Sequence, residues 1–341
     1  MTEFTDVLFS IANGHGHITL NRPQALNALT LPMIDAIAAQ LSAWERRVDI
    51  KAVIVTGSGD KAFCAGGDIK ALHAAKARGD LQYLEDFYRR EYTLNYRLAT
   101  YPKPVIAVMD GITMGGGAGI AFNCSHPIVT HKTVFAMPEC RIGLFPDVGA
   151  AYFLNKCSRA VAIAIGLTGL SLRGPGIIKV GLAKTFVGSG RVKEIALDNL
   201  DALALPVENA GIEQMLPQIE AVFGLASFDE IMTVLSARPG PWAEETRKIL
   251  AGFSPTSLKV TFAHLSQARG RGLAEVLATD FRLSQHFMAG HDFFEGVRAH
   301  LVDKDGAPKW QPADLAAVTP ARVAACFEAV PGVKDWAPPQ V

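Results

Sequence analysis

The N-terminal part of the chain begins with two short apolar runs and continues with an amphipathic stretch. The runs cover residues 7–12 and 15–21 and flank Asn13-Gly14, a pair that favours the type I′ turn of a β-hairpin. Over residues 33–44 apolar residues recur at helical spacing, and Thr30 precedes them at a typical helix start. This part therefore predicts a hairpin followed by a helix.

Two continuous apolar runs farther along the chain lead into glycine-rich turns. The run 51–57 precedes AFCAGGDI (62–69), and the run 103–111 leads into GITMGGGAG (111–119). Each turn leads into a segment that can be helical, and Asp68 is well placed to cap the first of these helices. Glycines at such a junction leave backbone N–H groups uncovered. Two of these turns side by side could offer two N–H donors to one oxygen, the arrangement that holds an oxyanion.

The rest of the hydrophobic pattern divides the chain into a part with both strands and helices and a part with helices alone. A long amphipathic helix is predicted over 81–99, and no strand-like run follows residue 191. Short buried-type strands are predicted over 105–109, 128–130 and 134–136. We therefore expect an α/β fold with a core over residues 1–190, a helical region over 191–341, and a surface tail from Pro331 onward.

The composition is that of a globular protein with a substantial core. Of 341 residues, 49% are hydrophobic and 19% are charged, and the formal net charge is zero, which argues against a nucleic-acid-binding surface. The five cysteines are scattered without metal-type spacing, so we expect reduced thiols and no metal site. The N-terminus lacks the features of a secretion signal or a transit peptide, and no run approaches the roughly 20 apolar residues of a membrane span. These observations predict a cytoplasmic protein without membrane contact.

Two acidic residues each follow a proline in FAMPECRIGLFPDVG (135–149). Glu139 and Asp147 could face one pocket, where a carboxylate beside a thioester carbonyl acts as a general base on water or as a nucleophile. Taken alone, such a pair more often marks turn and N-cap residues.

Other motifs give little support to competing functions. GGGAG does not complete GxGxxG because Ile120 stands at the third glycine position, and neither GxxxxGK[ST] nor GxSxG occurs. Cys64 is either a nucleophile or, more often for such a position, a small buried thiol beneath the turn. His15 and His17 alternate on a strand and are expected to face solvent.

Several segments together resemble the crotonase, or enoyl-CoA hydratase/isomerase, superfamily. These are NRPQALNAL (21–29), AFCAGGDI, GITMGGGAG and FAMPECRIGLFPDVG. The chain also resembles the branch of 3-hydroxyisobutyryl-CoA hydrolases in REYTLN (90–95), SPTSLKVT (254–261) and HDFFEGVRAHLVDKDGAPKW (291–310). The resemblance covers almost the whole chain. It implies a spiral of ββα units with a helical C-terminal region that closes over a coenzyme A thioester.

The resemblance also implies roles for individual residues. The N–H groups of Gly67 and Gly116 would form the oxyanion hole, and Glu139 and Asp147 would be catalytic. Glu91, Gly116, Glu139 and Asp147 would contact the substrate. The implied reaction cleaves 3-hydroxyisobutyryl-CoA to 3-hydroxyisobutyrate and CoA in valine breakdown, with no cofactor besides the CoA of the substrate. Cations are needed for the CoA phosphates, and the candidates are Arg22, Lys61, Lys70 and Lys259.

One departure from the superfamily bears on the reaction. Hydratases carry a second glutamate just after the GGG turn, and Gly119 stands there in this chain. Adding water across a double bond needs a second group, so a lone glutamate is a poor hydratase. An enoyl-CoA isomerase can work with one glutamate and stays an alternative, as does a non-catalytic acyl-CoA-binding protein. Superfamily members often form trimers or hexamers, so a homo-oligomer is a further expectation.

Overall fold

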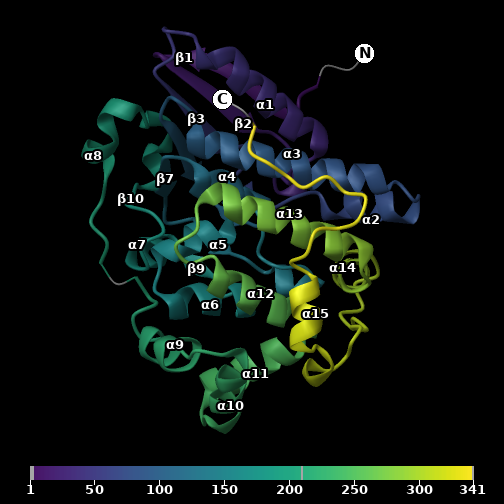
Figure 1. Cartoon of the computed structure of the whole chain (residues 1–341). Coiled ribbons are helices and arrows are strands. Elements are labelled where there is room, and N and C mark those ends of the chain that lie inside the picture. The colour runs from purple at the N-terminus through teal and green to yellow at the C-terminus, as the bar shows by residue number, and fades with distance from the viewer. Residues whose placement is uncertain (1–3, 209, 340–341) are drawn as a thin grey trace.

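The computed structural model describes residues 4–208 and 210–339, and the chain opens with a hairpin (Figure 1). Strands β1 (Val7–Ala12) and β2 (His15–Leu20) pair antiparallel. The turn residues Asn13 and Gly14 have φ angles of 51° and 74°, as a type I′ turn requires. The predicted hairpin is confirmed.

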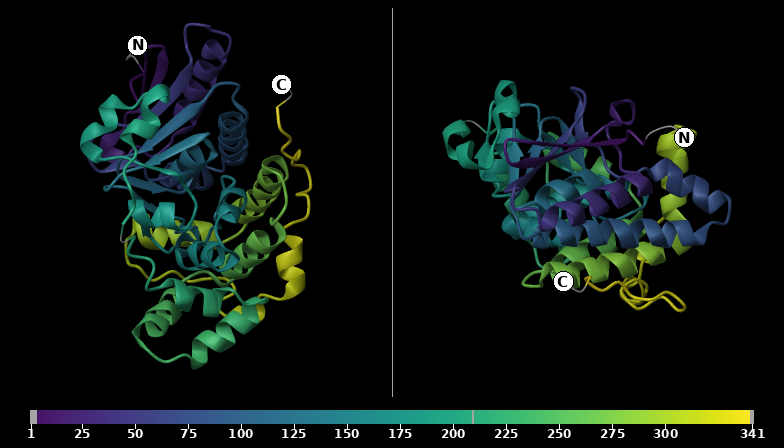
Figure 2. Two further views of the ribbon diagram at one scale, coloured as in Figure 1. Left: turned by 90° about the vertical axis from the view of Figure 1, so that its left-hand side faces the viewer. Right: turned by 90° about the horizontal axis from the view of Figure 1, so that it is seen from above.

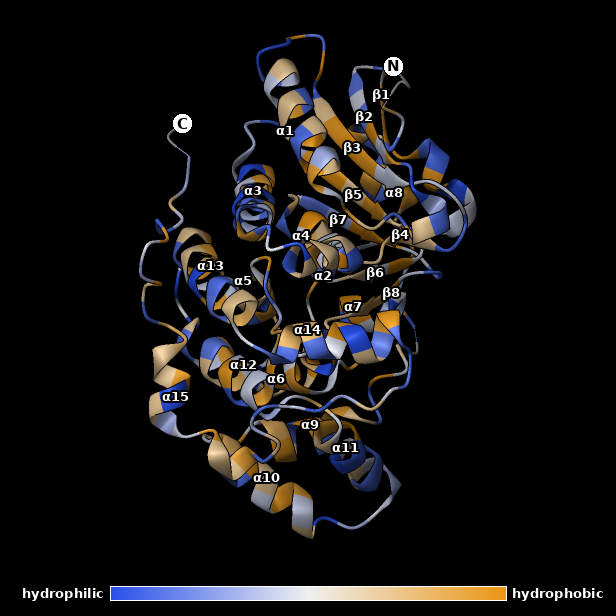
Figure 3. Ribbon diagram, turned by 90° about the vertical axis from the view of Figure 1, so that its right-hand side faces the viewer, coloured by the Kyte–Doolittle hydropathy of each residue, from blue (hydrophilic) through white to orange (hydrophobic). Residues whose placement is uncertain are grey.

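The hairpin forms one edge of a six-stranded sheet. Its order is β1-β2-β3-β5-β7-β10, and all pairs after the hairpin are parallel. The additional strands are β3 (Ala52–Gly57), β5 (Val105–Met109), β7 (His126–Val129) and β10 (Thr185–Phe186). Strands β3 and β5 are largely hydrophobic along their length (Figure 3), as expected for a sheet covered on both faces.

A second sheet of four strands brings the two glycine turns together. Its order is β4-β6-β8-β9, and only β8 and β9 run antiparallel. Because β4 and β6 are parallel neighbours, the turns that follow their carboxyl ends leave the same edge of the sheet. The strands are β4 (Ala62–Cys64), β6 (Ile112–Met114), β8 (Val134–Ala136) and β9 (Leu172–Arg173).

Helices follow the strands in the N-terminal part and dominate the C-terminal part. Thr30 accepts a hydrogen bond from the Met33 N–H, and Asp68 accepts one from the Ala71 N–H, so both predicted N-caps are confirmed. The first group is α1 (Leu31–Glu45), α2 (Ile69–Ala77), α3 (Leu81–Thr100), α4 (Gly116–Asn123), α5 (Ala150–Phe153), α6 (Arg159–Thr168) and α7 (Gly174–Lys179). The second group is α8 (Leu200–Leu203), α9 (Leu216–Phe223), α10 (Phe228–Ala237), α11 (Pro241–Ala251), α12 (Pro255–Gln267), α13 (Leu273–Ala289), α14 (Asp292–Val297) and α15 (Pro320–Ala325).

Alternate side chains of the central strands enter two separate cores. Val53 and Val55 face the main core, whereas Ile54 packs in a smaller cluster beneath residues 187–203. The same segment covers His15, whose Nε2 lies 3.2 Å from the Leu197 nitrogen. His15 is only 7% exposed, so its expected orientation toward solvent is wrong.

Two of the C-terminal helices pack on helices of the N-terminal part. Helices α12 and α13 lie against α6 and α3, while α9, α10 and α11 form the end of the molecule remote from the hairpin (Figure 2). The α/β fold with a helical C-terminal region is confirmed, and the boundary at residue 190 stays a proposal.

The segment that contains Trp336 differs from the prediction of a surface tail. Trp336 is 3% exposed, and its Nε1 donates to Thr93 Oγ1 on α3 at 3.0 Å. The Arg89 guanidinium, also on α3, donates to two carbonyls of the same segment. Most of residues 331–339 are exposed, as predicted for a surface segment, but the prediction is wrong for Trp336, which binds the segment to α3. Residues 340–341 lie outside the described residues.

Candidate active site

The first glycine turn presents one backbone N–H group. The Leu29 N–H donates to the Gly66 carbonyl at 2.8 Å, and the Asp68 N–H donates to the Leu29 carbonyl at 2.8 Å. These two bonds fix the backbone on either side of Gly67. Among the described residues no acceptor is found for the Gly67 N–H itself.

The second glycine turn presents another N–H group at the start of α4. Gly115 has a φ of 48° and precedes the helix, so Gly116 supplies the first of its N–H groups. These groups have no partner within a helix and carry its partial positive charge. Gly117 packs directly on the first turn, where a Cβ atom would overlap the Cys64 carbonyl oxygen.

The two N–H groups lie close together. A Cβ atom on Gly116 would be 3.3 Å from the Gly67 nitrogen, and one on Gly66 would be 3.8 Å from the Gly116 nitrogen. The family resemblance implied that these turns meet, and the structure brings them to one surface. Two neighbouring N–H donors can hold one developing negative oxygen.

Glu139 lies beside these amides. It begins a 3-10 turn, is 6% exposed, and its Oε1 would lie 3.0 Å from a Cβ atom on Gly115. Its Oε2 has no hydrogen-bond partner among the described residues. Burial, and then the charge of Asp147, raise the pKa of Glu139 well above its ordinary value. A group with these properties is a candidate general base or nucleophile.

Asp147 is the second predicted acid, and it is held by a tyrosine of α3. Its Oδ2 accepts a hydrogen bond from the Tyr92 hydroxyl at 2.6 Å, and the residue is 5% exposed. Burial raises its pKa to about 7, even though the bond from Tyr92 acts in the opposite direction.

Glu91 enters the same space from α3. It is 3% exposed, and its Oε1 would overlap a Cβ atom on Gly116, so the carboxyl group lies against the second glycine turn. That oxygen has no hydrogen-bond partner among the described residues. Burial, and then the charge of Asp147, raise the pKa of Glu91 well above its ordinary value.

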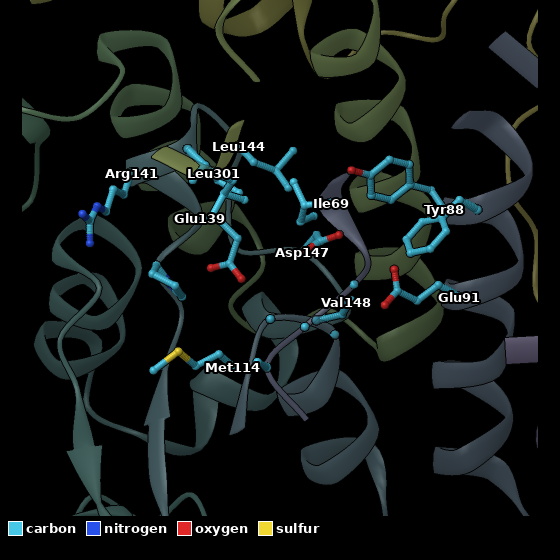
Figure 4. A pocket seen from close by; sticks show the side chains of 18 of the residues that line it. Ile69, Tyr88, Glu91, Met114, Glu139, Arg141, Leu144, Asp147, Val148 and Leu301 are labelled. Carbon is cyan, nitrogen blue, oxygen red and sulfur yellow. The ribbon is translucent and has the colours of Figure 1, made fainter. Parts of the chain in front are cut away.

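These groups line one cavity of about 360 Å³. The carboxyl groups of Glu91, Glu139 and Asp147 face it together (Figure 4). His300 and Leu301, from the helical C-terminal part, complete the wall. All five predicted site residues thus lie at one cavity. The apolar part of the lining includes Ile69, Phe87, Met114, Leu144 and Val148.

The comparison with known families agrees with this arrangement. A family model described as enoyl-CoA hydratase/isomerase matches residues 15–327. The chain belongs to this family. The crotonase resemblance is thereby confirmed.

Three curated relatives of this chain share the name "3-hydroxyisobutyryl-CoA hydrolase, mitochondrial". The chicken (Gallus gallus) protein is 40% identical over 342 residues, which cover 95% of this chain and 89% of the relative. The rat (Rattus norvegicus) protein is 42% identical over 93% of this chain and 87% of its own. The human protein is 40% identical, with coverage of 94% and 88%.

Two solved structures are similar to this family member over almost their whole length. A carnitinyl-CoA dehydratase from Mycobacterium thermoresistibile superposes with a TM-score of 0.90 at 35% identity, covering 96% of this chain and 97% of the other. An enoyl-CoA hydratase from Rhodobacter sphaeroides gives a TM-score of 0.89 at 36% identity, with coverage of 95% and 98%.

The sequence analysis did not identify the residues that fix the loop around Asp147. Val148 adopts a φ of 55°, an uncommon and costly conformation for a β-branched residue. The Asn123 Nδ2 donates to the Val148 carbonyl at 3.0 Å, and the Gly149 N–H donates to Asp280 Oδ2 at 2.8 Å. Asp280 also pairs with His264 Nε2 at 2.6 Å. Asp280 interrupts an apolar helix stripe, a signal that a buried acid has a partner.

The remaining sequence candidates have other surroundings. Cys64 is buried, and burial raises the pKa of its thiol to about 12, which favours the buried-thiol alternative over a nucleophile. Arg22 pairs with Asp68 at 3.2 Å, and Lys259 donates to the Val318 carbonyl at 3.0 Å. Within the described part of the chain, no group of three or more His, Cys, Asp or Glu side chains could hold a metal ion. No helix in that part is long and apolar enough to cross a bilayer.

Proposed function

We propose that this enzyme hydrolyses an acyl-CoA thioester, with 3-hydroxyisobutyryl-CoA as substrate and 3-hydroxyisobutyrate and CoA as products in valine breakdown. The observation that carries the proposal is the convergence of two N–H groups, Gly67 and Gly116, with an unpartnered oxygen of Glu139 at one cavity. Relatives with that name, 40–42% identical over nearly the full chain, support the choice of substrate.

The proposed chemistry begins at the thioester carbonyl. Its oxygen accepts hydrogen bonds from Gly67 and Gly116, and each such donor contributes about 3 kcal/mol of barrier lowering. Ionised Glu139 either attacks the carbonyl carbon or removes a proton from a water molecule that attacks it. The carbon–sulfur bond then breaks, and the electron pair leaves with the CoA thiolate. In the general-base route Glu139 returns the proton taken from water to this sulfur, which restores the carboxylate. In the first route water afterwards cleaves the mixed anhydride and restores Glu139.

Asp147 and Glu91 act on the acyl group in this proposal. One oxygen of Asp147 is already bonded to Tyr92, so Asp147 is oriented before substrate arrives. For the CoA phosphates, Arg22 and Lys259 already have protein partners, whereas Lys61 and Lys70 are exposed on either side of the first glycine turn. We therefore retain Lys61 and Lys70 as the phosphate candidates. A cytoplasmic location stays a prediction, since the named relatives are mitochondrial proteins, and so does assembly into a homo-oligomer.

A hydratase or isomerase of the same fold is the second candidate. The two similar solved proteins, at 35% and 36% identity, are named as a dehydratase and a hydratase, which favours it, and Glu91 would supply a second acid beside Glu139. Against it stands Gly119, where a Cβ atom would lie 2.6 Å from Val148 Cβ. The chain therefore has no room for a glutamate at the position where hydratases carry one.

The deciding experiment compares two substrates. Release of CoA from 3-hydroxyisobutyryl-CoA is measured with a thiol reagent, and hydration of crotonyl-CoA is followed by its absorbance. We expect fast CoA release and slow hydration; the reverse order would refute the hydrolase and support the second candidate.

A pair of variants then separates turnover from binding. Glu139→Gln is expected to lower kcat by at least about a hundredfold while CoA thioesters still bind. Glu244→Gln, at an exposed position of α11, is the matched control and should keep full activity. Full activity of Glu139→Gln would remove Glu139 from the mechanism, and an inactive wild-type protein that binds thioesters would be a non-catalytic acyl-CoA-binding protein.

A further inference from the structure

Two tyrosines one helical turn apart on α3 differ in how their hydroxyl groups are bonded. The Tyr92 hydroxyl donates to Asp147 at 2.6 Å. The Tyr88 hydroxyl is buried and has no partner among the described residues, although Tyr88 lines the cavity. Figure 4 shows this hydroxyl directed into the cavity, which it shares with the carboxyl group of Glu91.

An unpartnered phenol at such a place is uncommon. Buried polar groups almost always find a partner, and leaving one without costs about 1–3 kcal/mol. Tyr88 is 2% exposed, so bulk solvent does not solvate it as it would a surface residue. Burial, and then the charges of Asp147 and Glu91, raise its pKa well above the ordinary value. The group therefore stays protonated and offers an O–H donor to whatever occupies the cavity.

The acceptor atoms of the cavity complement this donor. Glu91 Oε1 is also without a partner, and Glu91 lies three residues after Tyr88, on the same face of α3. Arg141 is exposed, and its side chain is directed away from the acids (Figure 4). Tyr88 and Glu91 thus offer a donor and an acceptor to the same cavity.

We propose that Tyr88 determines specificity for acyl groups that carry a hydroxyl, by donating a hydrogen bond to that hydroxyl while Glu91 accepts one from it. An alcohol is both donor and acceptor, so it satisfies the two groups at once. An unsubstituted acyl chain would leave both buried groups unpaired, and sites built to bond a hydroxyl reject such analogues strongly. The inference rests on the proposed function and names the part of the substrate that this site recognises.

The test uses two thioesters that differ only in the hydroxyl group, 3-hydroxyisobutyryl-CoA and isobutyryl-CoA. For Tyr88→Phe we expect kcat/KM on the hydroxylated thioester to fall about tenfold, since one neutral hydrogen bond is lost, and kcat/KM on isobutyryl-CoA to stay within about twofold. Tyr92→Phe is the matched control. It disturbs Asp147 and should slow both substrates equally.

Binding to a Glu139→Gln background keeps the test independent of turnover. Calorimetry should show that this variant binds 3-hydroxyisobutyryl-CoA more tightly than isobutyryl-CoA, and that adding Tyr88→Phe removes most of the difference. This result supports the role of Tyr88 even if the wild-type protein releases no CoA. Absence of CoA release would refute only the proposed hydrolase activity. Equal losses for both thioesters, or an unchanged preference after Tyr88→Phe, would overturn the role of Tyr88.

Discussion

The cavity has an amide wall, formed by Gly67 and Gly116, and an acid wall, formed by Glu91, Glu139 and Asp147. The amide wall consists of backbone groups at the ends of two neighbouring strands, fixed where glycine allows the turns to touch. The acid wall consists of side chains from separate elements, and its supports come from α3 and from the C-terminal helices. The first wall depends on backbone packing, and the second depends on hydrogen bonds between distant residues.

The largest effect is expected where the two turns touch beneath the amide wall. Gly117→Ala would place a Cβ atom on the Cys64 carbonyl oxygen, and neither backbone can move away cheaply. We expect the free energy of unfolding in urea to fall by at least about 3 kcal/mol. Gly190→Ala, where a Cβ atom meets nothing within 4 Å, is the control. If both variants have the same midpoint of urea unfolding, the close packing of Gly117 on Cys64 does not contribute to stability.

A smaller loss is expected where the acid wall is supported. Asp280→Ala leaves the Gly149 N–H and His264 without their partner, and the free energy of unfolding should fall by about 2 kcal/mol. The value of kcat should fall as well, because the loop that carries Asp147 loses its anchor. Asp280→Asn keeps an acceptor oxygen and should recover most of the activity. If both variants behave alike, the hydrogen bonds do not position Asp147.

The acid wall should itself reduce stability at high pH. The folded-state pKa of Glu91 lies above its unfolded value, so the folded protein binds the proton more tightly. Stability is therefore greatest below the unfolded pKa and is lost as pH rises through the folded one. Glu91→Gln cannot ionise and should be more stable than wild type by about 1 kcal/mol at pH 8, with no gain near pH 4. A gain that is equal at both pH values would contradict the ionisation argument.

The smallest effect is expected at the outer support of the acid wall. Arg282 of α13 pairs with Asp335 at 2.6 Å, but both side chains are about 40% exposed. Arg282→Ala should cost about 0.5 kcal/mol, and the loss should shrink in 0.5 M salt, because exposed ion pairs are screened. Double-mutant cycles with Asp335→Asn measure the pair directly. A coupling above about 1.5 kcal/mol would mean that this pair holds the C-terminal segment more firmly than its exposure suggests.

Local signals in the sequence predicted much of the fold. Thr30 and Asp68 mark helix starts by their own side chains, and Asn13-Gly14 marks the hairpin, because each acts on residues within a few positions. The glycine turns belong to the same class, since a strand before and a helix after are visible in the sequence. Local patterns therefore predicted the two turns, whereas the choice of Gly67 and Gly116 came from the family resemblance, and the turns meet only because β4 pairs with β6.

The supports of the acid wall lie far apart in the sequence. Tyr92 and Asp147 are 55 positions apart, and Gly149 and Asp280 are 131 positions apart, so no local pattern joins them. The same limit explains His15 and Trp336, whose burial depends on segments that pack on them from elsewhere in the chain. The sequence offered one signal, the polar Asp280 on an apolar face of its helix. This signal indicates that Asp280 has a partner, but it does not indicate that the partner is Gly149.

The crowding of three buried carboxyl groups into one cavity has a consequence for the end of the proposed reaction cycle. The proposed thioester cleavage would create a fourth carboxyl group in the same space, where the uncharged thioester group had been. Once that new acid ionises, like charges in a poorly solvated space repel each other strongly. In the proposed reaction the acyl group enters uncharged and leaves as an anion, so repulsion from these carboxyl groups would favour departure of the product acid.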